Sequence, residues 1–248
     1  MKNLSIERNP VPLEARKVVK AYPLGHAQTR ALDGVDLRIE PGEFVAVMGP
    51  SGSGKSSLLN LLVGLDRPTS GEVWVEGRAL STLDEDGLTA LRRTRVGVIF
   101  QAFNLLPGLS AQENVELPLR AAGTSRQAAS QRARAMLERV GLAERCGHRP
   151  DELSGGQAQR VAIARALVIE PLIVVADEPT GSLDSENGSG VLRLLRQLND
   201  ERGVAVLMVT HAPAAAAYAD RIVTMSDGQV VGEERPRADQ PVLVHALA

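Results

Sequence analysis

The segment Gly49–Ser56, with the sequence GPSGSGKS, constrains the fold of this chain more than any other feature. It matches the pattern G-x-x-x-x-G-K-[ST] in full. It lies between an apolar run at Glu43–Met48 that is typical of a buried strand and a helical pattern over residues 55–65. Glycines at these positions let successive backbone N–H groups wrap phosphate oxygens. The segment therefore predicts a strand–turn–helix unit that holds the phosphates of a nucleotide.

The side chains of this segment supply the rest of the expected phosphate site. Lys55 would reach the β- and γ-phosphates, and the Ser56 hydroxyl would take a position at Mg²⁺. The residues predicted to contact the nucleotide here are Gly49, Pro50, Ser51, Gly52, Ser53, Gly54, Lys55, Ser56 and Ser57.

Two acidic residues close another apolar strand. Asp177 and Glu178 lie at the end of the run LIVVADEP at residues 172–179, and open α/β sheets bind ligands at the carboxyl ends of their strands. Asp177 suits Mg²⁺, and Glu178 suits the polarisation of an attacking water. Alone, the pair could equally be two capping acids after a strand. Beside an intact phosphate loop, the hydrolytic interpretation is favoured.

The segment Leu153–Gln157, LSGGQ, begins a long amphipathic helical pattern. A helix N-terminus collects unpaired N–H groups and the positive end of the helix dipole, so it favours an anion. Ser154, Gly155 and Gly156 offer donors there, and glycine allows the backbone to approach closely. The segment is either a helix start that receives a phosphate from elsewhere or a plain N-capped helix.

Strands that alternate with helices along the chain predict an α/β fold with parallel strands. Stretches with strand character, broken by Gly and Pro, at residues 13–22 and 31–50 indicate an antiparallel opening. Helical periodicity between residues 104 and 168 indicates a helical block inserted in the core. Further strands are expected at residues 71–77, 96–100, 171–179 and 204–211, helices at 190–203 and 212–221, and a final hairpin at 221–232.

Composition and charge narrow the classes of function. A formal net charge of −2 gives no electrostatic reason to expect a nucleic-acid partner. Cys146 is the only cysteine, so no internal disulfide framework exists and a reducing compartment is favoured. Residues 1–16 lack the apolar region of a secretory signal. No apolar run approaches the roughly 18 residues of a spanning helix, so we expect the chain outside the bilayer, with a membrane partner still open.

The phosphate loop, LSGGQ and ADEP, in this order, resemble the motifs of the ATP-binding cassette (ABC) ATPases over residues 13–232. LSGGQ is the most specific of them, since kinases and GTPases with a phosphate loop lack it. The resemblance implies an α/β P-loop NTPase core with a mixed, largely parallel sheet, an N-terminal antiparallel β subdomain and an inserted α-helical subdomain. Residues 13–232 would form a single domain, with terminal extensions at 1–12 and 233–248. The implied cofactors are ATP and Mg²⁺.

The same resemblance implies a site shared by two copies of the chain. In this family the anion at LSGGQ is the γ-phosphate of ATP bound to the opposite subunit of a head-to-tail pair, and Asp184 in GSLDS would cross that interface. Gln101 would sense the γ-phosphate and Mg²⁺, His211 would contact the γ-phosphate, and Tyr22 would stack on adenine. Nucleotide contacts outside the phosphate loop would thus come from Tyr22, Ser154, Gly155, Gly156, Gln157 and Asp184, catalytic groups from Lys55, Gln101, Glu178 and His211, and metal ligands from Ser56, Gln101 and Asp177.

Residues 31–73, 100–119 and 176–185 further resemble the lipoprotein-releasing and macrolide-exporter group of ABC ATPases. That resemblance implies an ATPase subunit on the cytoplasmic face of the inner membrane. It would power an integral membrane permease for export or extraction of a lipoprotein, peptide or drug-like molecule. The apolar segment FNLLPGL at residues 103–109 is either core packing or part of a groove for a permease coupling helix.

Two alternatives use the same motifs. One is a non-transport ATPase that regulates a cell-wall or division complex through a membrane partner. The other is a soluble ABC protein of DNA repair or translation. Proteins of that last kind usually carry long coiled coils or two cassettes, and this chain shows neither.

Overall fold

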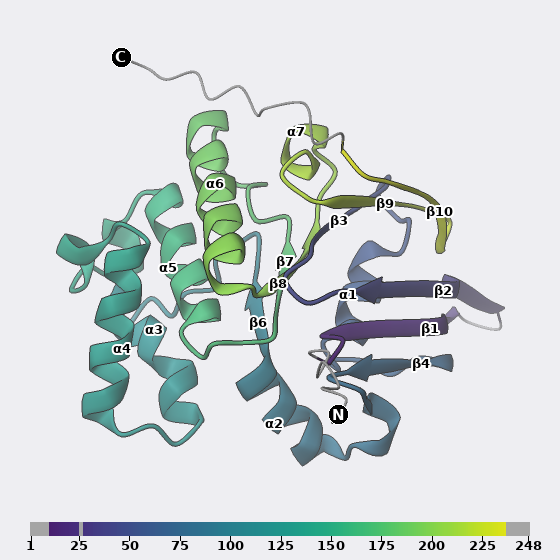
Figure 1. Cartoon of the computed structure of the whole chain (residues 1–248), viewed down its shortest axis with the longest axis horizontal. Coiled ribbons are helices and arrows are strands. Elements are labelled where there is room, and N and C mark those ends of the chain that lie inside the picture. The colour runs from purple at the N-terminus through teal and green to yellow at the C-terminus, as the bar shows by residue number, and fades with distance from the viewer. Residues whose placement is uncertain (1–9, 25–26, 237–248) are drawn as a thin grey trace, which may run out of the picture.

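The computed structural model describes residues 10–24 and 27–236 of the 248. A six-stranded sheet lies between a group of helices on one side and a smaller four-stranded sheet on the other (Figure 1). The strands are β1 (Leu13–Leu24), β2 (Ala27–Ile39), β3 (Phe44–Met48), β4 (Ser70–Val75), β5 (Arg78–Ala79), β6 (Val96–Ile99), β7 (Ile173–Asp177), β8 (Ala205–Val209), β9 (Arg221–Ser226) and β10 (Gln229–Glu234). The helices are α1 (Lys55–Leu62), α2 (Glu85–Arg95), α3 (Ala111–Ala121), α4 (Arg126–Arg139), α5 (Gly155–Leu167), α6 (Ser185–Arg202) and α7 (Pro213–Ala216).

The six-stranded sheet is mixed and largely parallel. Its strand order is β10-β9-β3-β8-β7-β6, with every neighbouring pair parallel except the β9–β10 hairpin. The carboxyl ends of β3, β7 and β8 therefore meet at one edge of the sheet, where open α/β folds hold their ligands. The smaller sheet, in the order β2-β1-β4-β5, is antiparallel. Both the α/β class and the antiparallel opening are confirmed.

Two hydrophobic clusters cover the two faces of the large sheet. Phe44 and Ala46 of β3 belong to one cluster, and Val45 and Val47 belong to the other, as alternation along a strand requires. The first cluster also contains buried residues of α3, α4, α5 and α6, and the second contains those of α1 and of the small sheet. Consequently α1 and α5 pack on opposite faces of the same sheet.

The predicted helical block is present between β6 and β7. Its helices α3 and α4 begin at serines whose hydroxyls accept from the backbone, Ser110 from Glu113 N and Ser125 from Ala128 N. Cys146 is buried against this block as a small core residue. Within the described residues, no helix combines the length and the apolar character needed to cross a membrane.

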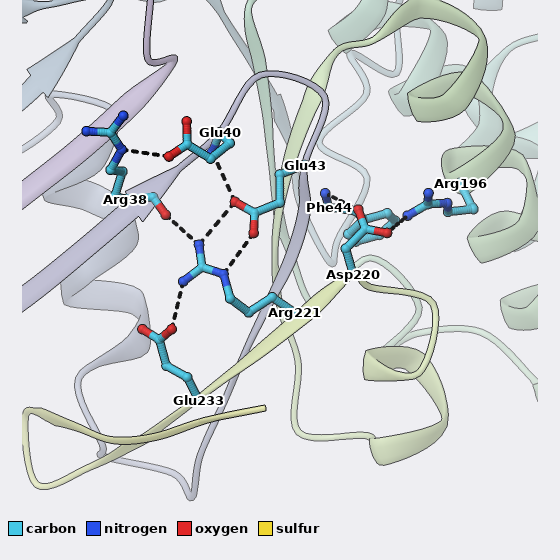
Figure 2. A network of polar contacts seen from close by, with 8 residues as sticks. All are labelled: Arg38, Glu40, Glu43, Phe44, Arg196, Asp220, Arg221 and Glu233. Atoms are coloured by element: carbon cyan, nitrogen blue, oxygen red, sulfur yellow. Dashed lines mark hydrogen bonds and ion pairs between the residues drawn. The ribbon is translucent and has the colours of Figure 1, made fainter. Parts of the chain in front are cut away.

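An ion-pair network ties the beginning of β3 to the beginning of β9 (Figure 2). Arg221 donates to both carboxylate oxygens of Glu43, at 2.8 and 3.1 Å, and to Glu233 at 3.0 Å. Burial raises the pKa of Glu43, but the hydrogen bonds from Arg221 and from Glu40 N, together with the positive charge of Arg221, outweigh it and leave that pKa below its ordinary value. Asp220 accepts from Phe44 N at 2.9 Å and from Arg196 at 2.8 Å. The network fixes the end of the sheet at which β3 and β9 begin, opposite the end that carries the phosphate loop.

Three helices differ from the prediction. Helix α2 was not expected, because only Leu88 and Leu91 of its eleven residues are buried and the apolar pattern is sparse. Helix α6 begins at Ser185, five residues before the expected start, since the Asp184 side chain caps it. Helix α7 ends at Ala216 instead of continuing to 221. The bonds of Asp220 to Phe44 draw the chain into β9 and stop the helix there.

Candidate functional site

The phosphate loop connects β3 to α1 as expected. The Lys55 ammonium, on a side chain that is largely buried, donates to Gly49 O and Pro50 O at 2.8 Å each and to Ser53 Oγ at 3.3 Å. These neutral oxygens are weak acceptors for a cation. The charged oxygens of a phosphate could replace them as stronger partners of the ammonium. Ser56 is exposed at the beginning of α1, and the Ser57 side chain is partly buried.

Two glycines of the loop lie where no side chain fits. A Cβ on Gly49 would stand 2.2 Å from Met225 O in β9, and one on Gly54 would stand 2.3 Å from Ala31 O in β2. The φ angle of Gly54 is +97°, in the region that glycine favours. The loop is therefore wedged between the two sheets, which holds its N–H groups in place.

The acidic pair lies beside the loop, at the carboxyl end of β7. Asp177 is in register with Val209 of β8, and Glu178 N donates to Val209 O at 2.9 Å. A hydrogen bond of 2.7 Å joins His211 Nδ1 to the Glu178 carboxylate. Glu178 has a φ of +46°, a strained value for a residue with a side chain. The structure thus brings Glu178 and His211 together although 33 positions separate them in the sequence.

The electrostatic environment of Asp177 suits a cation. Burial, and then the neighbouring charge of Glu178, raise the pKa of Asp177 above its ordinary value, while the Lys55 ammonium lowers it. A cation at the carboxylate would offset both unfavourable effects. Oxygens of Asp177, Ser56 and Gln101 are the hard donors that Mg²⁺ prefers.

The donor set fits an ion that is held largely by its substrate. Within the part of the chain that the structure describes, no group of three or more His, Cys, Asp or Glu side chains gathers into a metal site. Mg²⁺ usually binds through one or two carboxylates, waters and substrate phosphates. The residues present therefore fit the predicted Mg²⁺.

Gln101 follows β6 and lies against the segment after Glu178. A Cβ on Gly181 would stand 2.8 Å from Gln101 Nε2, and Ser182 Oγ donates to Gln101 O at 3.2 Å. Asp184, further along this segment, accepts from Asn187 N at 2.9 Å and Asn187 Nδ2 at 2.7 Å. These bonds hold the pKa of Asp184 below its usual range. The observed contacts of Asp184 are those of a helix cap, and its role between subunits stays a prediction.

The LSGGQ segment begins α5 with a capping box. Ser154 Oγ accepts from Gln157 N at 3.3 Å, and Ser154 N donates to Gln157 Oε1 at 3.0 Å. The amide of Gln157 is thus engaged within the helix, and the exposed Ser154 and Gly155 stand at its open end. A Cβ on Gly156 would stand 2.7 Å from Asn187 Oδ1 of α6. The structure shows the capped helix, and the binding of a phosphate at its exposed start stays a prediction.

Tyr22 lies in β1, and strand pairing places it near the phosphate loop. It is paired with Thr29 of β2, two residues before Ala31, whose carbonyl meets Gly54. Its hydroxyl donates to Asp66 Oδ2 at 3.0 Å, and its side chain is 37% exposed. The stacking of Tyr22 on adenine stays a prediction.

The sequence interpretation missed two residues of this region. Arg165 of α5 donates to Phe103 O at 2.8 Å and to Asn104 O, in the segment after Gln101, and burial lowers its pKa. Asp66 accepts a hydrogen bond from the Tyr22 hydroxyl. Neither carries a motif, because an arginine in an amphipathic helix and an aspartate in a loop are ordinary surface residues. Only the tertiary contacts identify them.

Comparisons with known proteins agree with this geometry. The family model described as ABC transporter matches residues 32–181. The macrolide export ATP-binding/permease protein MacB of Agrobacterium fabrum is 51% identical over 90% of this chain and 34% of its own length. The uncharacterized ABC transporter ATP-binding protein MJ1508 of Methanocaldococcus jannaschii is 49% identical over 88% of this chain and 97% of its own length.

Solved structures give the same result. The dimeric cassette MJ0796, in a post-hydrolysis state bound to ADP and Pi, has a TM-score of 0.83 and 45% identity, over 91% of this chain and 99% of that chain. A cbiO1 chain from Clostridium perfringens has a TM-score of 0.82 at 28% identity, over 92% of this chain and 89% of that chain. The chain spans about a third of the length of the MacB relative, 34%.

Proposed function

This chain belongs to the ABC transporter family as its ATP-binding domain, and on that premise we propose that it hydrolyses ATP to power a membrane permease. The permease would export or extract a lipoprotein, peptide or drug-like molecule, and the ATPase would lie on the cytoplasmic face of the inner membrane. The observation that carries the hydrolytic assignment is the 2.7 Å contact between His211 and the Glu178 carboxylate. That contact lies next to Asp177, at the sheet edge that holds the phosphate loop.

The chain's own residues divide the work of hydrolysis. Lys55 exchanges the carbonyls of Gly49 and Pro50 for oxygens of the γ-phosphate and offsets their charge. Glu178 accepts a proton from the attacking water while the water oxygen bonds to the γ-phosphorus and the bond between that phosphorus and ADP breaks. His211 orients the Glu178 carboxylate. When bound, Mg²⁺ would neutralise the negative charge that develops on the phosphates. Asp177, Ser56 and Gln101 would hold it.

A second copy of the chain, in a head-to-tail pair, would complete the binding site for the γ-phosphate. Helices α1 and α5 pack on opposite faces of the sheet, so the sheet separates the helix that begins at Ser154 and Gly155 from the helix of its own phosphate loop. The beginning of α5 is open and donor-rich, as an anion site at a helix N-terminus requires. The related cassette MJ0796 is described as dimeric.

The variant Glu178→Gln tests the hydrolytic assignment. The amide cannot take the proton of water, so we expect turnover to fall about 100-fold or more, while ATP affinity stays close to that of the parent chain. ATP should then hold the variant as a dimer. ATPase rate, nucleotide affinity and light-scattering mass check the three parts.

Glu170→Gln is the matched control, because that exposed glutamate lies outside the site. It should behave as the parent chain in all three measurements. Near-normal turnover in Glu178→Gln would remove Glu178 from the mechanism.

A cleft beside the Gln101 segment supports the permease partner. Its volume is about 450 Å³, its walls are mostly apolar, and it lies between β6, α2, α3 and the end of α5. Asn104 lines it, whereas Leu105 packs into the core and Leu106 is 49% exposed. The packing of Leu105 thus agrees with the core use expected of the segment at residues 103–109, and Asn104 on the cleft wall supports the groove that we propose for the permease. The charged residues that line the cleft are Arg92, Arg93 and Arg165. An apolar permease segment with a carboxylate matches this lining.

Arg93→Glu tests this docking cleft. Arg93 is exposed on the cleft wall, so the change should leave the fold intact and repel an acidic segment. We expect co-purification of the permease from native membranes in mild detergent to fall severalfold, with basal ATPase unchanged. Arg134→Glu, on exposed α4 and away from the cleft, is the control. Recovery of only cell-wall or division proteins with the parent chain would instead favour the regulatory alternative.

A further inference from the structure

The orientation of the Tyr22 ring depends on two charged neighbours. We propose that Lys20 and Asp66 are positioning residues that hold this ring so that one face is free to stack on the adenine of the bound nucleotide. The proposal rests on the proposed function, because it takes Tyr22 as the adenine contact.

The two residues hold the ring at different points. Asp66 Oδ2 accepts from the Tyr22 hydroxyl at 3.0 Å, which fixes the phenolic end. Lys20 Nζ lies 4.9 Å from the ring centroid and donates to Asp66 Oδ1 at 2.6 Å. Because the ammonium occupies one face, a flat base has only the other face available. A half-exposed tyrosine without such contacts would sample several rotamers and lose part of its stacking energy to ordering.

Asp66 is also tied to the phosphate loop's own helix. Leu65 N and Asp66 N donate to Asn60 O of α1 at 2.9 and 3.3 Å, and α1 begins at Lys55. The Lys20 ammonium also donates to Arg67 O at 2.8 Å, and Thr69 Oγ1 accepts from Ala21 N at 3.0 Å. The loop at residues 66–69 thus connects β1 to α1. Through it, the base-stacking ring and the phosphate loop are held at a fixed spacing.

The charge of Asp66 supports this role. Burial raises the pKa of Asp66, but hydrogen bonds from Lys20, Arg67 N and Tyr22 outweigh it and leave that pKa below its ordinary value. The carboxylate is therefore ionised at neutral pH and accepts from all three donors at once.

The test compares the dissociation constants of ATP and of inorganic tripolyphosphate, and so separates the contribution of the base to binding from that of the phosphates. Tyr22→Ala removes the ring, and we expect about tenfold weaker ATP binding. Asp66→Asn and Tyr22→Phe break the orienting bond and keep the ring, so about threefold weaker ATP binding is expected from each. Tripolyphosphate affinity should not change in any of them. Tyr22→Phe leaves the backbone bonds of Asp66 intact and keeps the test decisive if Asp66→Asn folds poorly.

A double variant and a matched control complete the design. In the Tyr22→Ala background, Asp66→Asn should cause no further loss of ATP affinity, because it acts only through the ring. Asp36→Asn is the control, since Asp36 pairs with Lys17 at 2.9 Å in the same small sheet without an aromatic partner. It should leave both dissociation constants unchanged.

The outcomes distinguish the two levels of the proposal. Equal weakening of ATP and tripolyphosphate by Asp66→Asn, or an additive loss in the double variant, would overturn the positioning role. So would unchanged ATP affinity in Tyr22→Phe when Tyr22→Ala is weakened. If Tyr22→Ala itself leaves the ratio of the two constants unchanged, the predicted stacking of Tyr22 on adenine fails instead.

Discussion

At the scale of single residues, Asp177 carries a charge that its surroundings disfavour. Burial and the Glu178 charge raise its pKa in the folded chain above the value in the unfolded chain. Such a group binds more protons when folded, so its ionisation lowers the free energy of unfolding as pH rises from the unfolded pKa through the folded one. We attribute this loss of stability to the role proposed for Asp177, in which the charged carboxylate would hold Mg²⁺.

Asp177→Asn should therefore separate stability from function. We expect the nucleotide-free variant to melt about 2 °C or more above the parent chain at neutral pH, with ATP turnover abolished. The gain should vanish as pH falls below the folded pKa, where Asp177 is itself neutral. Calorimetry across pH 3–8 checks this. Asp184→Asn is the control, and its melting temperature should change in the opposite direction, because the pKa of Asp184 is lowered and its charge is favourable. A lower melting temperature for Asp177→Asn at neutral pH would contradict this account.

The positions of the site residues were predictable wherever a motif fixed them. Lys55 and Asp177 were expected together because parallel strands end at a common edge, and the Lys55 charge does affect the pKa of Asp177. Asp66 could not be predicted, because its contact with Tyr22 spans 44 positions and depends on the register of β1. A residue that acts through a tertiary contact leaves no local pattern in a single sequence.

At the scale of elements, the phosphate loop depends on contact with β2. Gly54→Ala would place a methyl group 2.3 Å from Ala31 O and 2.9 Å from Leu32 Cδ2, at a φ of +97°. We expect a loss of about 3 kcal/mol or more in the free energy of unfolding. Gly52 has a φ of +81° and open space around it, so Gly52→Ala should cost only about 1 kcal/mol. Urea denaturation of the pair checks the difference, and equal losses would contradict the β2 contact.

Long, strongly patterned elements were predictable, and their ends were not. The strands at the site and the helical block follow from continuous apolar runs and helical periodicity. The ends of α6 and α7 were displaced because Asp184 caps one helix and Asp220 bonds to Phe44 at the other. Helix α2 was missed because the burial of two leucines leaves little periodic signal.

At the scale of the whole molecule, α5 joins the two regions that the proposed function couples. Its beginning presents Ser154, and near its end Arg165 holds the backbone carbonyls of Phe103 and Asn104 beside the docking cleft. A rigid helix between these points could transmit a change at a bound phosphate to the proposed permease partner. The sequence could predict neither connection, because periodicity places a helix but not the loop that its side chain contacts.

Ser154→Asp tests the anion site without removing the helix cap. Aspartate caps helices about as well as serine and favours the positive end of the dipole, so stability should change by less than about 0.5 kcal/mol. Its carboxylate would repel the γ-phosphate of the opposite copy, and we expect ATP-dependent dimerisation to be lost. Ser125→Asp, at the equivalent cap of α4, should dimerise normally. Size-exclusion chromatography with ATP in a Glu178→Gln background checks both.

Mixing two inactive variants then decides whether the site is shared. Lys55→Ala removes the ammonium from the phosphate loop, and Ser154→Asp blocks the opposite helix start, so in a head-to-tail pair neither variant alone forms an intact site. A mixed pair places both changes in one site and leaves the other intact. Each mixed pair should retain about half of the parent activity per pair if the sites act independently, so activity should return in proportion to the mixed pairs that form. The same recovery cannot occur if Lys55 and Ser154 of one chain serve the same nucleotide. An inactive mixture in which mixed pairs are demonstrated by tagged co-purification would therefore contradict independent, shared sites.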